Sequence, residues 1–160
     1  MSDCCSTKAT SEAPPVADCP ADGARSKQVD LLTVKSQVRK LPLGMPNTQY
    51  YFCEAQDCDV VYFALDPRAP AFRRADLLVR VGVKETTDPI PVCYCFGFSR
   101  QDIWDEILRT GKSTVIERIA EEVKAGHCAC EVRNPSGKCC LGHAVTAAEA
   151  GLKVLKSTTS

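Results

Sequence analysis

The placement of its cysteines is the feature that most constrains how this chain folds. Six of the 11 cysteines fall within residues 93–140, in two groups on either side of a segment with a helical pattern. The groups are Cys93 and Cys95, then Cys128, Cys130, Cys139 and Cys140. Packing alone does not require so many thiols in so short a segment, whereas a metal cluster does. We therefore interpret this region as a binding site for an iron–sulfur cluster.

The apolar content also favours a fold stabilised by metal. The chain has 160 residues, and its hydrophobic share of 44% includes the 11 cysteines. Small domains with such modest cores are commonly stabilised by metals or disulfides. Lysine plus arginine and aspartate plus glutamate number 20 each. A neutral chain has no long-range field that attracts nucleic acid or an anionic membrane, so neither is predicted as a partner.

Metal ligation is favoured over disulfide pairing. The first residues, Met1 to Cys5, lack the charged start and apolar run of a signal peptide. No apolar segment approaches the roughly 20 residues of a membrane span. These features predict a cytoplasmic protein, in which thiols stay reduced. An odd number of cysteines also prevents complete internal pairing, so a secreted disulfide scaffold is the disfavoured alternative.

Residues 1–17 are predicted to form a disordered tail, because they contain few large apolar side chains. The tail carries Cys4 and Cys5. Adjacent thiols can bind a soft ion such as Cu⁺, but two neighbouring side chains alone make a poor closed site. A copper-binding pair and a tail with two reactive thiols stay open as alternatives.

Two half-sites in the first part of the chain predict a mononuclear zinc site. Cys19 and Asp22 have the outline of a zinc knuckle, with Asp22 where a second cysteine usually stands. Cys53 and Cys58 form the other knuckle. Carboxylate oxygen is an acceptable zinc ligand, so the four side chains make a candidate tetrahedral site of the zinc-ribbon type. For residues 19–23 an ordinary turn is the alternative, because Pro, Asp and Gly favour turns.

The surrounding pattern predicts an α+β fold made of a small ribbon-like β domain and a helical domain. A short helix capped by Thr33 is predicted at residues 34–39. Strands are predicted at residues 47–53, 59–63 and 75–83. Because residues 84–91 are polar and contain two prolines, we place the domain boundary there. The two domains are then residues 18–86 and 91–156.

Two helices are predicted after Cys95, each with start and stop signals. Ser99 caps the first, and Asp102 stands at the capping-box position. Gly111 ends this first helix. The second helix begins at Ser113 or Thr114, with Glu117 completing a capping box, and ends at Gly126. A last helix is predicted at residues 144–155. Acidic side chains on the second helix would repel phosphate, so a DNA-binding helix–turn–helix is disfavoured. The helical hairpin and a tight turn at residues 134–137 bring the cysteine groups together.

These motifs together resemble a known family. Residues 92–95 (VCYC), the helix pair and residues 134–140 (NPSGKCC) are similar to domains of the bacterioferritin-associated-ferredoxin (BFD-like) type. They are preceded by YYFC at 50–53, CDVVYF at 58–63 and RVGVKE at 80–85. The combination resembles the N-terminal iron–sulfur- and zinc-containing domain of CopZ-type copper chaperones, from about Cys19 to His143.

The resemblance implies a 2Fe–2S cluster held by four cysteines and a separate zinc in the N-terminal half. Carried over to this chain, the cluster ligands are Cys93, Cys95, Cys130 and Cys140. The second group is spaced C-x-C-x8-C-C where the ferredoxin-like version has C-x2-C. Cys128 and Cys139 therefore stay open as alternative ligands or as extra thiols for Cu⁺. Family members can also carry a copper-binding domain with M-x-C-x-x-C, whereas this chain contains no C-x-x-C.

Three functions remain open. The first is a cytosolic metallochaperone-type protein, related to copper, with the cluster as a redox or sensing element and a structural zinc. Its partners would be metal ions and a copper-transporting ATPase or a separate metal-carrier domain. The second is an electron-transfer or cluster-scaffold protein with no copper role, and the third is a structural protein with two zinc sites. An enzyme is not favoured, because no catalytic pattern surrounds the two histidines, His127 and His143; a redox reaction at the cluster stays open.

Overall fold

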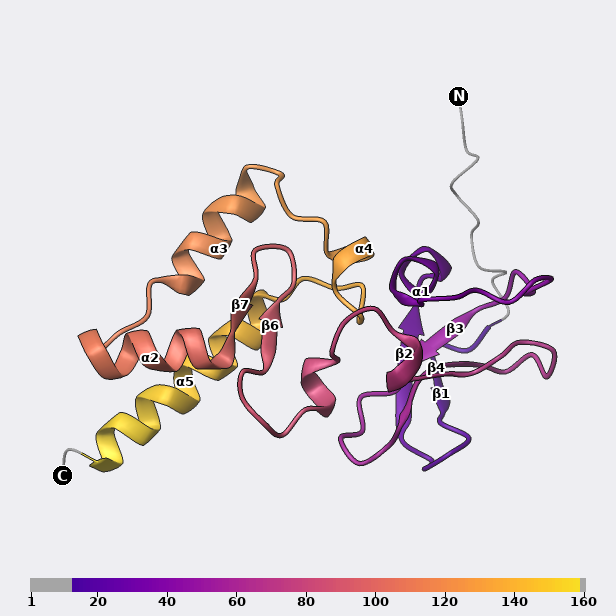
Figure 1. Cartoon of the computed structure of the whole chain (residues 1–160), viewed down its shortest axis with the longest axis horizontal. Helices are drawn as coiled ribbons and strands as arrows, with labels where there is room; N and C mark the ends of the chain where they lie inside the picture. The colour runs from indigo at the N-terminus through magenta and orange to yellow at the C-terminus, as the bar shows by residue number, and fades with distance from the viewer. Residues whose placement is uncertain (1–12, 159–160) are drawn as a thin grey trace. The chain divides into compact units, whose positions relative to one another are not determined.

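The computed structural model of the chain describes residues 13–158 and divides into two compact units between Val79 and Arg80. The prediction of an α+β fold is confirmed, since the chain combines an antiparallel sheet with helices (Figure 1). The Cys4–Cys5 pair lies outside the described residues. Among residues 13–158, no helix has the length and apolar character needed to cross a membrane. The domain limits 18–86 and 91–156 stay a prediction.

The first unit is built on a five-stranded antiparallel sheet whose strands lie in sequence order. They are β1 (Val16–Asp18), β2 (Arg25–Val29), β3 (Tyr50–Phe52), β4 (Val60–Ala64) and β5 (Phe72–Arg73). Tyr51 of β3 stands opposite Phe63 of β4, and their rings stack with centroids 5.5 Å apart. Both side chains are fully buried. The predicted aromatic hairpin is confirmed, and it fixes the positions from which the second knuckle extends.

Other predictions for the first unit were wrong. Helix α1 (Leu31–Gln37) has Asp30 as its N-cap, so Thr33 is a buried residue inside the helix rather than its cap. Residues 75–83 do not form a strand. They contain two short 3-10 helices, η2 (Arg74–Asp76) and η3 (Gly82–Lys84). The backbone N–H of Arg73 donates to the Asp76 carboxylate at 2.8 Å, and such local hydrogen bonds compete with strand pairing.

The second unit combines a small β-hairpin with helices (Figure 1). Its elements are β6 (Pro91–Cys93), β7 (Phe98–Ser99), α2 (Arg100–Thr110), α3 (Val115–Lys124), α4 (Cys130–Arg133) and α5 (Leu141–Thr158). The predicted capping box of α2 is confirmed, because Ser99 and Asp102 each accept the other's backbone N–H. Gly111 ends α2 with a φ of 84° that favours glycine.

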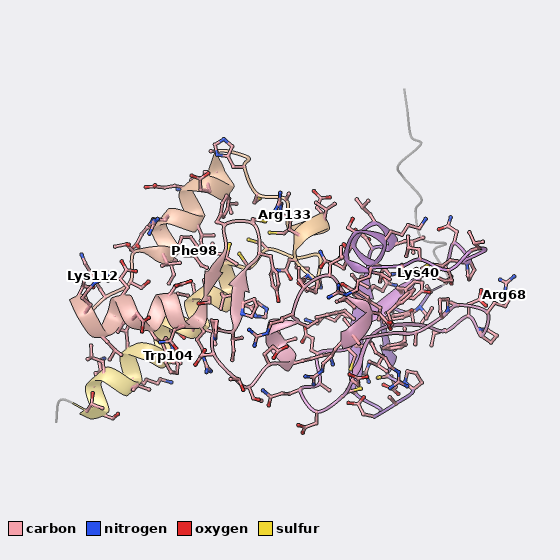
Figure 2. All side chains as sticks on the ribbon, viewed as in Figure 1. Lys40, Arg68, Phe98, Trp104, Lys112 and Arg133 are labelled. Carbon is pink, nitrogen blue, oxygen red and sulfur yellow. The ribbon has the colours of Figure 1, made fainter. Side chains whose placement is uncertain are left out.

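The core of the second unit lies between β6, α2, α3 and α5. Ile103, Ile107 and Ile119 are fully buried there. Trp104 of α2 donates its indole N–H to the Ala147 carbonyl of α5 at 2.8 Å, which fixes these two helices against each other (Figure 2). Cys93 and Cys140 belong to the same buried cluster. Two of the predicted cluster ligands are therefore positioned by core packing.

Candidate metal centres

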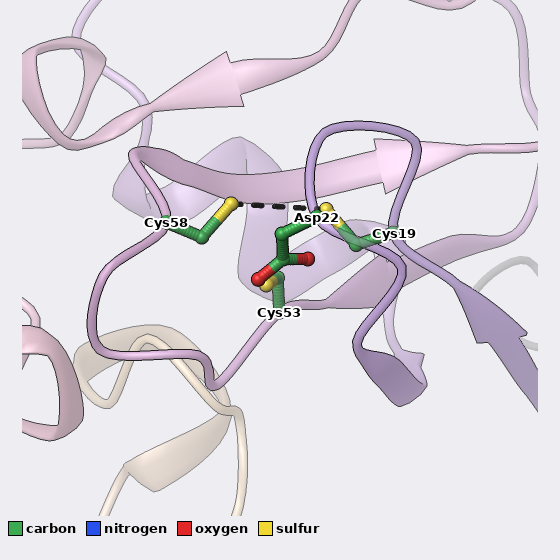
Figure 3. A group of neighbouring side chains, drawn as sticks. All are labelled: Cys19, Asp22, Cys53 and Cys58. Atoms are coloured by element: carbon green, nitrogen blue, oxygen red, sulfur yellow. Dashed lines mark hydrogen bonds between the residues drawn. The ribbon is translucent and has the colours of Figure 1, made fainter.

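The first candidate centre lies at the knuckles of the sheet unit. The ligand atoms of Cys19, Asp22, Cys53 and Cys58 all lie within 4.8 Å of one another (Figure 3). The Cys19 and Cys58 sulfurs are 3.9 Å apart. The structure thus brings together all four residues that the sequence predicts for zinc.

Hydrogen bonds set the shape of each knuckle. In the first, Gly23 N–H donates to the Cys19 carbonyl at 2.7 Å, and Gly23 has a φ of 75°. In the second, Cys53 N–H donates to the Val61 carbonyl at 2.9 Å, so this thiol is tied to the β3–β4 ladder. No disulfide joins the cysteines within residues 13–158. The sulfurs are therefore available as ligands.

The donor set fits zinc. A zinc ion bonded to sulfur at about 2.3 Å in tetrahedral geometry places its sulfur ligands about 3.8 Å apart. The separation of 3.9 Å between the Cys19 and Cys58 sulfurs agrees with that geometry. Burial raises the pKa of Cys19 to about 12, so this thiol is protonated without metal. Binding of a metal would release its proton.

The second candidate centre lies in the helical unit and consists of two thiol pairs. The Cys95 and Cys130 sulfurs are 3.6 Å apart. The Cys93 and Cys140 thiols share a hydrogen bond, which lowers the pKa of Cys93 to about 6 and raises that of Cys140. The pairs lie near each other, because Cys130 is close enough to help raise the pKa of Cys140. The four cysteines carried over from the family resemblance thus converge.

Backbone and side-chain hydrogen bonds hold these thiols in place. Ala129 N–H donates to the Cys95 sulfur at 3.2 Å. Asn134 is buried and donates its side-chain N–H to the Lys138 carbonyl at 2.9 Å. Gly137 N–H donates to the Asn134 carbonyl at 2.8 Å, which confirms the predicted turn. This closed turn returns the chain from α4 to Cys140.

The donor set of the second centre fits a 2Fe–2S cluster. Such a cluster takes four cysteine ligands, two for each iron. The Cys95–Cys130 separation of 3.6 Å is close to the about 3.8 Å edge of a tetrahedral thiolate site. Cys93 and Cys140 supply the other pair. Cys130 is also largely buried, and burial raises its pKa to about 12.

The other cysteine positions of this region are more open. Cys139 is exposed, and Cys128 is half-buried. Cys139 lies near enough to Cys130 and Cys140 to interact electrostatically with both. His127 is paired with Glu122, with 2.6 Å between Nδ1 and the carboxylate. These positions leave Cys128 and Cys139 beside the four-thiol group.

Sequence reasoning missed Arg74 at the first centre. Its guanidinium donates to the carbonyls of Gln56 and Cys58, inside the second knuckle. The side chain also lies 4.0 Å from the Asp59 carboxylate. The contact depends on how β5 pairs with β4, and nothing in the local sequence around Arg74 indicates it.

Comparison with known proteins agrees with the first centre. A CopZ-type family described as a zinc binding domain matches residues 16–77, a span that contains all four zinc candidates. The copper chaperone CopZ of Archaeoglobus fulgidus is 36% identical over 125 residues, which are 78% of this chain and 58% of that protein. The chain thus spans a little over half the length of this relative.

The fold has a solved counterpart. The X-ray structure of the Archaeoglobus fulgidus CopZ N-terminal domain superposes with a TM-score of 0.64 and 34% sequence identity. The match covers 81% of this chain and 96% of that domain. These findings confirm the predicted resemblance to the N-terminal domain of CopZ-type copper chaperones, whereas the BFD-like 2Fe–2S half stays a prediction. The matching family is described by zinc, and the relative is named for copper.

Proposed function

We propose that this chain, a homologue of the CopZ N-terminal domain, is a metallochaperone-type protein related to copper. In this proposal it carries a structural zinc at Cys19, Asp22, Cys53 and Cys58. A 2Fe–2S cluster at Cys93, Cys95, Cys130 and Cys140 is its redox or sensing element, within a BFD-like second unit. The cluster supplies one-electron redox chemistry when it is bound.

One observation carries the proposal: two separate thiol-rich centres with different donor sets lie in one chain. The first is a compact group of three sulfurs and a carboxylate, which suits a single zinc ion. The second consists of two adjoining pairs, which suit a cluster with two irons. Within residues 13–158 only the first centre gathers three or more ligand atoms tightly enough for a single metal ion, which argues for a cluster over a second zinc ion at the two pairs.

The copper role rests on homology and on accessible thiols. The relative is called a copper chaperone, and soft thiolates select Cu⁺. Exposed Cys139 and half-buried Cys128 adjoin the second centre, where Cu⁺ can reach them. A copper-transporting ATPase or a separate metal-carrier domain is the expected partner. A cytoplasmic location, where thiols stay reduced, suits this chemistry.

Quantitation of iron, zinc and acid-labile sulfide in anaerobically purified protein tests both centres. We expect two irons, two sulfides and one zinc per chain, by the ligand counts of such sites. Protein with zinc alone and no visible iron–sulfur absorption would contradict the cluster. Anaerobic titration with Cu⁺ in competition with glutathione tests the copper role, which fails if the chain binds no more tightly than glutathione.

An electron-transfer or cluster-scaffold protein is the second candidate. It rests on the two thiol pairs of the second unit alone and requires no copper site. A reversible reduction potential together with no competitive binding of Cu⁺ would support this alternative.

A further inference from the structure

The two knuckles of the zinc centre are held very differently. Cys19, Cys53 and Cys58 are buried within an apolar cluster that also contains Tyr51 and Phe63. Asp22, the one oxygen ligand, is exposed to solvent. The three sulfur ligands of the proposed site are therefore shielded from solvent, whereas the carboxylate of Asp22 is accessible to it.

A local hydrogen bond helps to position the Asp22 carboxylate in its knuckle. Its Oδ1 accepts the backbone N–H of Ala24, two residues further on, at 3.0 Å. An Asx turn of this kind joins neighbouring residues. The first knuckle itself is tied to the same short segment, since Cys19 N–H donates to the Ala24 carbonyl at 2.9 Å.

The second knuckle is anchored from outside. Arg74 donates to the carbonyls of Gln56 and Cys58 within this loop. Its own backbone N–H donates to the Asp59 carbonyl at 3.0 Å. An arginine with several fixed hydrogen bonds holds a loop rigidly. Its positive charge also offsets a centre in which three thiolates and a carboxylate outweigh the two charges of zinc.

We propose that Asp22 is the labile ligand of this centre, through which the metal ion enters and leaves. This goes beyond the proposed function but rests on its zinc site. With zinc held by the three thiols, an incoming thiolate from glutathione or a protein acceptor would take the position of the Asp22 carboxylate. The carboxylate would return to water as an anion, and no electron would be transferred. Structural zinc sites with four cysteines are closed, whereas an exposed oxygen ligand leaves one position open to exchange.

Zinc release from the full chain tests the proposal, with pyridylazoresorcinol as the metal-binding dye and glutathione as the attacking thiolate. Asp22→Cys closes the site with a fourth sulfur and should slow release by about tenfold or more. Asp22→Asn weakens the oxygen ligand and should accelerate release by a similar factor. Asp57 is exposed and adjoins Cys58 but lies outside the ligand group, so Asp57→Cys and Asp57→Asn are matched controls that should release zinc like the wild type.

Replacing zinc by cobalt gives a second test, which measures the number of sulfur ligands and does not depend on release rates. The sulfur-to-cobalt charge-transfer absorption should rise in Asp22→Cys and stay unchanged in Asp57→Cys. Release rates for Asp22→Cys and Asp22→Asn that both equal the wild-type rate would overturn the proposal. If the wild-type protein contains no zinc, the zinc centre itself fails, so the two failures are distinguishable.

Discussion

Replacing Gly82 by alanine should displace the strand that carries Cys93. A Cβ at this position would lie 2.2 Å from the Pro91 carbonyl oxygen and 3.4 Å from the Tyr94 hydroxyl. Carbon and oxygen normally approach no closer than about 3.3 Å, so the two backbones would have to separate by about 1 Å. Pro91 begins β6, and Cys93 ends it. The movement would therefore pass directly to Cys93, a proposed cluster ligand.

The expected loss of stability follows from the contacts that this movement disturbs. Overpacking costs about 1–3 kcal/mol. The upper part of that range applies, because neither the added Cβ nor the Pro91 carbonyl oxygen can move away without moving the backbone. Tyr94 Oη accepts the Gly82 N–H at 2.8 Å and donates to the Arg80 carbonyl at 2.7 Å. Weakening these bonds costs about 1 kcal/mol more. A smaller gain comes from the stiffer unfolded chain, so the net loss is about 3 kcal/mol.

Urea unfolding followed by tryptophan fluorescence measures this loss selectively. Trp104 is the one tryptophan of the sequence and lies in the second unit. Gly142→Ala is the matched control, because a Cβ there meets nothing within 4 Å and α5 continues through it. The control should gain up to about 1 kcal/mol from helix propensity. Equal stabilities for the two variants, with unchanged iron content, would refute the reasoning.

Three other substitutions test separate contacts. Arg74→Lys should accelerate zinc loss to the dye by about tenfold, whereas Arg73→Lys, whose side chain reaches only Asp59 at 3.4 Å, should release zinc like the wild type. Asp88→Asn should cost about 1 kcal/mol in urea unfolding at pH 7, because Asp88 pairs with the guanidinium of Arg100 at 2.7 and 2.9 Å. Arg100 lowers the pKa of Asp88, so this difference is complete above the ordinary aspartate pKa of about 3.9 and disappears as pH falls through the lowered value. Glu106→Ala should lower stability by about 2 kcal/mol in the same assay, because the carboxylate accepts three hydrogen bonds at the start of α3.

The features predicted correctly from the sequence depend on near neighbours. The Ser99–Asp102 capping box and the Gly111 stop each involve residues of a single helix. The Cys53 and Cys58 knuckle was predicted at the base of the aromatic hairpin, because the strands on both sides were recognisable. Local hydrogen bonds and side-chain alternation depend on residues close together in the sequence, so they can be predicted without knowing the tertiary structure.

The features that were missed depend on residues brought together from a distance. Ser113 or Thr114 was predicted to start α3, with Glu117 completing a capping box. Thr114 is the capping residue, but the carboxylate of Glu106 accepts the hydrogen bonds of Ser113 and Thr114. Strands β1 and β2, on either side of the predicted knuckle at residues 19–23, were not predicted, because they are polar and carry no strong alternation. Such contacts are decided by tertiary packing, which overrides local preference.

At both candidate centres some of the proposed ligands are buried in a hydrophobic core and one is more exposed. Cys19, Cys53 and Cys58 lie in the core of the first unit, and Cys93 and Cys140 lie in that of the second. Burial raises the pKa of Cys19 and of Cys130, so without metal these thiols are neutral and stay compatible with an apolar environment. At these two positions the metal-free protein therefore avoids burying uncompensated charge, and metal binding creates a thiolate where a cation offsets it. Cys93 differs, because the neighbouring Cys140 thiol lowers its pKa to about 6. Of the proposed ligands, Asp22 at one centre is exposed and Cys95 at the other is half-buried, so solvent can reach both. A metal can then enter or leave from the open side while the buried thiols keep the site in shape.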